Sequence, residues 1–174
     1  MNQNLVSAVF SSHSEAERAV SQLRAAGVED RAISIVAQHD GKNKETDGAG
    51  EESASFLSKA AAGAGVGALL GIAALAIPGV GPLVAAGAIA ESAIGGAALT
   101  GTAVGAAAGG LSSVFSKHGV GEEDARYYED HVNNGGVFVS VDTSSAGISA
   151  ASASDILYGA GGHSSTRSRM ASAM

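Results

Sequence analysis

The chain has 174 residues and a formal net charge of -7 at pH 7, and its apolar share of 45% is rich in alanine, with aromatic residues at only 4%. This length suits one domain, and the acidic balance argues against a nucleic-acid-binding surface, which needs clustered lysine and arginine. Because the chain has no cysteine, a disulfide framework, a thiol nucleophile and a thiolate metal site are excluded.

The first predicted elements are a strand, a helix and a second strand. Residues 5–10 form a short apolar run that predicts a strand. Ser14 and Glu17 have the spacing of a capping box and predict the start of a helix, while Gly27 suits the left-handed position that ends one. Residues 32–37 predict a second strand, and a β-α-β unit of this kind favours a parallel pair of strands.

An acidic stretch and a long apolar segment come next. Residues 38–55 are rich in Asp, Glu, Lys, Gly and Ser, which predicts a flexible linker. In the apolar segment 56–116, the only charged residue beyond Lys59 is Glu91. The motif Pro78–Pro82 cannot continue a helix, because proline lacks a backbone N–H. We therefore expect the chain to fold back there, with helices at residues 56–77, 83–93 and 97–115.

Glycine recurs in this segment at four-residue spacing, as Gly63, Gly67, Gly71 and as Gly101, Gly105, Gly109. Each glycine inside a helix costs about 1 kcal/mol relative to alanine, so close packing has to return that cost. Glycine at this spacing lets a second helix approach closely. An antiparallel register also brings Phe56 to within one residue of facing Phe115. The sequence therefore predicts an Ala/Gly-rich helical hairpin that self-associates through these eight residues.

The same segment has a second interpretation as a membrane element. Its uncharged length suffices for the roughly 30 Å hydrocarbon core of a bilayer, but alanine and glycine are weakly lipophilic. The larger apolar residues of the first helix contribute only roughly -2 to -4 kcal/mol to insertion. Packing against itself or against sister chains is therefore favoured, and insertion of the hairpin into a bilayer is the alternative.

The remaining sequence predicts further regular elements. Residues 122–132 combine an acidic first turn with an apolar stripe and predict a helix. Residues 137–141 predict a third strand, and residues 147–158 predict another helix. The Ser-rich residues 159–174 are expected to form a tail that is mobile from His163 onward.

Residues suited to catalysis or metal binding do not cluster in the sequence. The five histidines lack the spacing of a metal site, and each is expected on the solvated surface. They are His13, His39, His118, His131 and His163. Tyr127 is the only plausible surface aromatic residue. We therefore predict no catalytic residue, no metal and no cofactor.

A family resemblance is carried by residues 9–20, 23–27, 77–82, 119–129 and 135–137. Its most specific part leads from Tyr127-Tyr128-Glu129 to Gly135-Gly136-Val137. In these stretches the chain resembles the bacterial general stress, or heat-induced stress, protein family. The resemblance implies a ferredoxin-like α+β module of the form β-α-β…α-β, split by a glycine-rich hydrophobic insertion. It also implies induction by stress and no enzymatic role, and no catalytic residue carries over.

These predictions divide the chain into five parts: the first half of the α+β module (1–37), the acidic linker (38–55), the glycine-zipper hairpin (56–116), the second half of the module (117–158) and the Ser-rich tail (159–174). The N-terminus lacks the basic start and apolar run of a secretory signal, so a cytoplasmic protein is expected. The leading hypothesis is a non-enzymatic stress-response protein that the hairpin assembles into a homo-oligomer. The alternatives are a membrane-associated protein with lipid as its partner, and a small-ligand-sensing α+β module.

Overall fold

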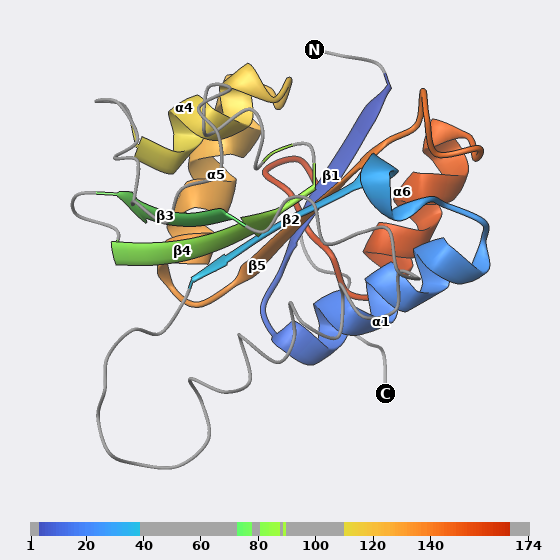
Figure 1. Cartoon of the computed structure of the whole chain (residues 1–174), viewed down its shortest axis with the longest axis horizontal. Helices are drawn as coiled ribbons and strands as arrows, with labels where there is room; N and C mark the ends of the chain where they lie inside the picture. Colours follow the sequence, from blue (N-terminus) through green and yellow to red (C-terminus); the bar gives the residue numbers. More distant parts are fainter. Residues whose placement is uncertain (1–3, 39–72, 78–80, 88, 90–109, 168–174) are drawn as a thin grey trace.

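The computed structural model describes residues 4–38, 73–77, 81–87, 89 and 110–167, which form an α+β fold (Figure 1). In chain order the elements are β1 (Leu5–Phe10), α1 (His13–Ala25), the short 3-10 helix η1 (Asp30–Ala32), β2 (Ile33–Gln38), β3 (Ala73–Ile77), β4 (Gly81–Ala86), α4 (Gly110–Lys117), α5 (Glu122–Asn133), β5 (Val137–Asp142) and α6 (Ala150–Gly159). The strands form one five-stranded antiparallel sheet in the order β1-β5-β2-β4-β3.

β5 is an inner strand of this sheet and separates the first two strands of the chain. It pairs antiparallel with β1 on one side and with β2 on the other, and all its residues but the last are buried. β1 and β2 therefore run parallel to each other without pairing, so the predicted parallel pair is wrong. The physical reason is that β5 carries apolar residues on both faces. A position between two neighbouring strands and two helix layers buries the most apolar surface.

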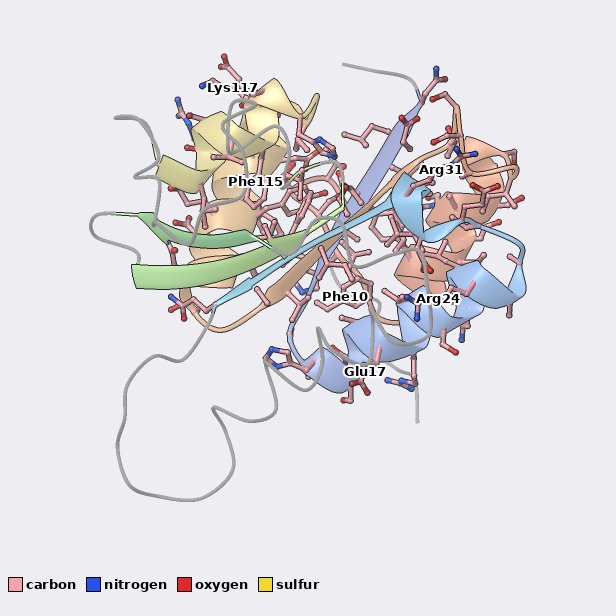
Figure 2. All side chains as sticks on the ribbon, viewed as in Figure 1. Phe10, Glu17, Arg24, Arg31, Phe115 and Lys117 are labelled. Carbon is pink, nitrogen blue, oxygen red and sulfur yellow. The ribbon has the colours of Figure 1, made fainter. Side chains whose placement is uncertain are left out.

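Helices cover both faces of the sheet (Figure 1). α1 and α6 pack on one face around Phe10, and α4 and α5 pack on the other face around Phe115. Figure 2 shows these two phenylalanines on opposite sides of the sheet. Because side chains alternate along a strand, β5 contributes Val139 to the first core and Phe138 to the second.

Helix α1 begins earlier than predicted. Ser12 is its N-cap, and the Ser12 hydroxyl accepts a hydrogen bond from the backbone N–H of Glu15 at 3.3 Å. The capping box predicted at Ser14 and Glu17 is therefore wrong, because Ser12 and Glu15 have the same spacing and lie closer to the end of β1. The predicted end of the helix is confirmed, since Gly27 has a φ of +91°.

The apolar segment contains strands where helices were predicted. Residues 73–77 form β3 and residues 81–86 form β4, so the helices predicted there are wrong. The predicted reversal of the chain is confirmed, because Ile77 pairs with Gly81 in an antiparallel hairpin. The cause is non-local: β4 pairs with β2 and satisfies backbone groups that would otherwise be left at the edge of β2.

The other predicted elements are confirmed where the structure describes them. α4 is the end of the last helix predicted for the apolar segment, and α5 and β5 match the helix and strand predicted after it. α6 begins at Ala150, after Ser149, whose hydroxyl accepts from the backbone N–H of Ser152 at 3.1 Å. The acidic linker beyond Gln38 and the rest of the apolar segment lie outside the described residues. Within the described part of the chain, no helix has the length and apolar character needed to cross a membrane.

Candidate functional site: the two edges of the sheet

The residues predicted for self-association fall mostly outside the described structure. The six zipper glycines and Phe56 lie outside it, and their contacts stay predictions. Phe115 is fully buried within the single chain. Its ring centroid lies 4.4 Å from that of Phe138 and 6.3 Å from that of Tyr128. Phe115 therefore has a core role in the α4 and α5 layer, and its predicted packing against Phe56 stays a prediction.

The outer edge of β1 is covered by residues 160–167, which we call the C-terminal strap. His163 pairs antiparallel with Val9: Val9 N donates to His163 O at 2.9 Å, and His163 N donates to Val9 O at 3.0 Å. His163 and Ser164 are each only 3% exposed. The predicted mobile tail is therefore wrong for the strap, because its backbone satisfies hydrogen-bonding groups of an edge strand.

Two tyrosines close the same edge near Ser7. The hydroxyls of Tyr128 in α5 and Tyr158 in α6 both donate to the backbone oxygen of Ser7, at 3.0 Å and 3.1 Å. Because α5 and α6 lie on opposite faces of the sheet, the two phenols reach this carbonyl from both sides. Burial is the main cause that raises the pKa of Tyr128, so its hydroxyl stays protonated and remains a donor.

The strap also contributes to a cluster of side chains that we call the histidine cluster. It consists of the rings of Tyr127, His131 and His163 and the hydroxyl of Ser11. Tyr127 Oη lies 3.0 Å from His163 Nδ1, and Ser11 Oγ lies 3.3 Å from His163 Nε2. The ring centroid of His131 lies 4.2 Å from that of Tyr127 and 4.8 Å from that of His163. The predicted surface position is therefore wrong for His163, and Tyr127 is half-buried beside it.

The histidine cluster connects separate parts of the chain through hydrogen bonds. The two ring nitrogens of His163 face hydroxyl groups, so a neutral ring can donate to one and accept from the other. His131 Nδ1 donates to the backbone oxygen of Tyr127 at 2.9 Å, which fixes the orientation of its ring. Nowhere among the described residues do three or more His, Cys, Asp or Glu side chains form a group that could hold a metal ion.

Polar contacts hold the rest of the strap against α5 and α6. The backbone N–H and the hydroxyl of Ser165 donate to Asp124 Oδ1 at 3.0 Å and 2.5 Å. Arg167 Nη1 donates to Ser154 Oγ at 2.9 Å, and the Arg167 guanidinium lies 4.7 Å from the ring centroid of Tyr158. Beyond the point where it pairs with β1, the strap is therefore held by contacts with both α5 and α6.

The opposite edge of the sheet, β3, has a different character. β3 is the last strand in the sheet order and pairs with β4 along one side. On its other side, no strand within the described ranges pairs with it. Its sequence, Ala-Ala-Leu-Ala-Ile, contains no charged residue and no proline. Charged residues and proline are common devices by which proteins prevent an edge strand from pairing with another chain, and β3 has neither.

The β3-β4 hairpin is fixed to the rest of the sheet just after β4. The hydroxyl of Ser34 in β2 accepts a hydrogen bond from the backbone N–H of Ile89 at 3.2 Å, and Ile89 is fully buried. Gly87 has a φ of +83°, and a Cβ atom at this position would overlap the backbone oxygen of Ile33. The close approach of these two backbones therefore requires glycine at position 87.

A row of three serines crosses the sheet and was missed in the sequence. Ser7 and Ser34 are both register partners of Ser140, whose hydroxyl lies 3.3 Å from His118 Nε2. Burial, the larger effect, lowers the pKa of His118, while the nearby charge of Asp142 opposes it. The sequence signal is a lone serine within each of three apolar runs, but only the strand register shows that the serines are neighbours. His118 is half-buried, so its predicted position on the solvated surface is also wrong.

Comparison with known proteins gives no relative from which a function could be transferred. No protein-family model, no curated protein and no solved structure matches this chain. The resemblance to the general stress protein family therefore stays a prediction from sequence.

Proposed function

We propose that this chain is a non-enzymatic bacterial stress-response protein that self-associates through its apolar segment, residues 56–116, into a homo-oligomer. The observation that carries the proposal is the uncharged edge strand β3, which the segment adds to a sheet whose opposite edge the chain itself covers. An apolar segment of this length with a single charge beyond Lys59 favours association in water, because burial of its surface is favourable.

The finer fold proposal is a ferredoxin-like module. β1, α1, β2, β5 and α6 follow one another in the chain order of such a module, and the C-terminal strap takes the place of its last strand beside β1. α1 and α6 lie on the same face of the sheet. α5 covers the opposite face, together with α4. On this proposal β3, β4, α4 and α5 therefore belong to the insertion, and the helix at residues 122–133 is not the second helix of the module, although the sequence predicted it in the second half of the module, residues 117–158.

Self-association is tested by light scattering coupled to size-exclusion chromatography in detergent-free buffer. We expect a mass that is a multiple of the 16.9 kDa of one chain. Replacing both Gly67→Leu and Gly105→Leu should reduce the mass if the zipper glycines line the contact, because leucine prevents close approach of two backbones. Gly159→Leu is the matched control, since a Cβ at Gly159 meets no atom within 4 Å.

These measurements test self-association and the role of the zipper glycines separately. A monomer of the unmodified chain across the concentration range would contradict self-association. An oligomer of unchanged size in the double glycine variant would leave self-association in place and remove the zipper glycines from the contact. Flotation with liposomes tests the membrane alternative, which requires that the protein rise with the lipid.

A further inference from the structure

The two outer edges of the sheet differ in how their backbone groups are satisfied. On β1, the strap pairs with Val9, and two tyrosine hydroxyls bind the carbonyl oxygen of Ser7. On β3, the described part of the chain supplies no strand for the outer side. Unpaired N–H and C=O groups along an edge strand form a template for another strand. Among the described residues, the sheet therefore has one outer edge that is partly covered, at Ser7 and Val9, and one outer edge suited to pairing.

The charge distribution favours a second copy of this chain as the partner of β3. The formal charge of -7 makes two copies repel each other wherever their charged surfaces meet. β3 itself is uncharged and lies in the stretch from Ala60 to Ser116, whose only charge is Glu91. Two copies can therefore approach through this edge without bringing charged side chains of β3 together.

We propose that β3 pairs antiparallel with β3 of a second copy about a two-fold axis, so that the two sheets become one continuous sheet. This inference rests on the proposed self-association and assigns its contact to the strand edge. Leu75 is the central residue of β3, so a symmetric register places it opposite Leu75 of the second copy. Because both copies use the same edge about a two-fold axis, and the strap and two tyrosines already occupy backbone groups of β1, the assembly ends at a dimer.

Single-cysteine cross-linking tests the contact directly, because the natural chain contains no cysteine. We would introduce one cysteine at a time at each of the five positions of β3 and oxidise the purified protein under mild conditions. Directly opposed residues of an antiparallel pair lie close enough for a disulfide after small adjustments. Leu75→Cys is expected to give the highest yield of covalent dimer. Ser21→Cys, at an exposed position of α1 outside the sheet, is the control that should stay monomeric on a denaturing gel.

A charge placed at the same position gives a second readout. Leu75→Lys should shift the light-scattering mass from twice 16.9 kDa to 16.9 kDa, because two like charges would face each other at the axis. Ser21→Lys adds the same charge at an exposed position of α1, outside the sheet, and should leave the mass unchanged. Circular dichroism shows whether Leu75→Lys keeps its fold, and if it does not, the cross-linking result alone decides.

The results distinguish this inference from the proposed function. If the unmodified chain associates but none of the five β3 cysteines cross-links above Ser21→Cys, the β3 contact is wrong and self-association stands through another surface. If the unmodified chain is a monomer and no cysteine cross-links, both the contact and the proposed self-association are wrong. A covalent dimer with its maximum at Leu75→Cys supports both.

Discussion

Val9 and His163 exchange both of their backbone hydrogen bonds, although they come from opposite ends of the chain. This pair places the C-terminal strap beside β1, at the outer edge of the sheet. His163 fixes the strap further, since its ring contacts Tyr127 of α5 and Ser11 before α1. One residue therefore pairs with the edge strand β1 and contacts both α5 and the connection between β1 and α1, which holds the strap against the folded chain.

Removal of the strap is expected to open the β1 edge. A chain that ends at Gly162 lacks the part of the strap from His163 onward, and so loses the backbone pair with Val9 and the side chain of His163. We expect it to form assemblies larger than those of the full chain, because both edges of the sheet can then pair. Light scattering at several protein concentrations measures this change. A chain that ends at Arg167 is the control, and equal masses for the two truncated chains would contradict a guarding role of the strap.

The two tyrosines at Ser7 are expected to act together. Tyr128→Phe or Tyr158→Phe alone leaves one hydroxyl on the Ser7 carbonyl and should cost about 1 kcal/mol in free energy of unfolding. The double variant leaves this carbonyl oxygen with neither phenol as a donor, so its cost should exceed the sum of the single costs. Urea unfolding of the four proteins gives the comparison. Strict additivity would show that the two hydroxyls satisfy the carbonyl independently.

Local sequence patterns predicted the elements of the α+β module well. The apolar stripe of α1, the end of that helix at Gly27 and the strand β5 follow from spacing and residue type, which are properties of short stretches. The place of β5 between β1 and β2 does not follow in this way, because it depends on contacts between residues far apart in the chain.

The apolar segment shows the limit of such reasoning most clearly. The motif of two prolines correctly predicts a reversal, since proline restricts the backbone on its own. The flanking residues are alanine, leucine, valine and isoleucine, which fit a buried helix and a buried strand equally well by periodicity. Residues 81–86 form a strand because they pair with the edge of β2, which is far away in the sequence. The candidate site was missed for a related reason, because the sheet edges exist only once the strand order is known.

Gly87 is expected to be more sensitive to substitution than Gly27, although both have positive φ. Gly27→Ala places its Cβ in open space, so only the backbone conformation is penalised, at about 1–2 kcal/mol. Gly87→Ala carries the same penalty and also forces the chain after β4 away from the Ile33 carbonyl. We expect a larger loss in free energy of unfolding and faster amide hydrogen exchange in β4. Equal losses for the two variants would show that the close approach at Gly87 is relieved without cost.

Acidification is expected to destabilise the fold through His118. Burial lowers the pKa of His118 below its ordinary value of 6.5 in the folded chain, in spite of the opposing charge of Asp142. The unfolded chain therefore binds this proton more readily, so the stability contributed by neutral His118 is present above pH 6.5 and is lost as the pH falls below it.

His118→Gln tests this contribution, because glutamine can still hydrogen-bond to Ser140 but does not titrate. Chemical unfolding between pH 5 and pH 8 should show a weaker pH dependence for this variant than for the unmodified chain. His13→Gln, on the first turn of α1, controls for the loss of a histidine elsewhere. If the unmodified chain and His118→Gln have parallel stability curves over this range, proton uptake by His118 does not contribute to acid sensitivity.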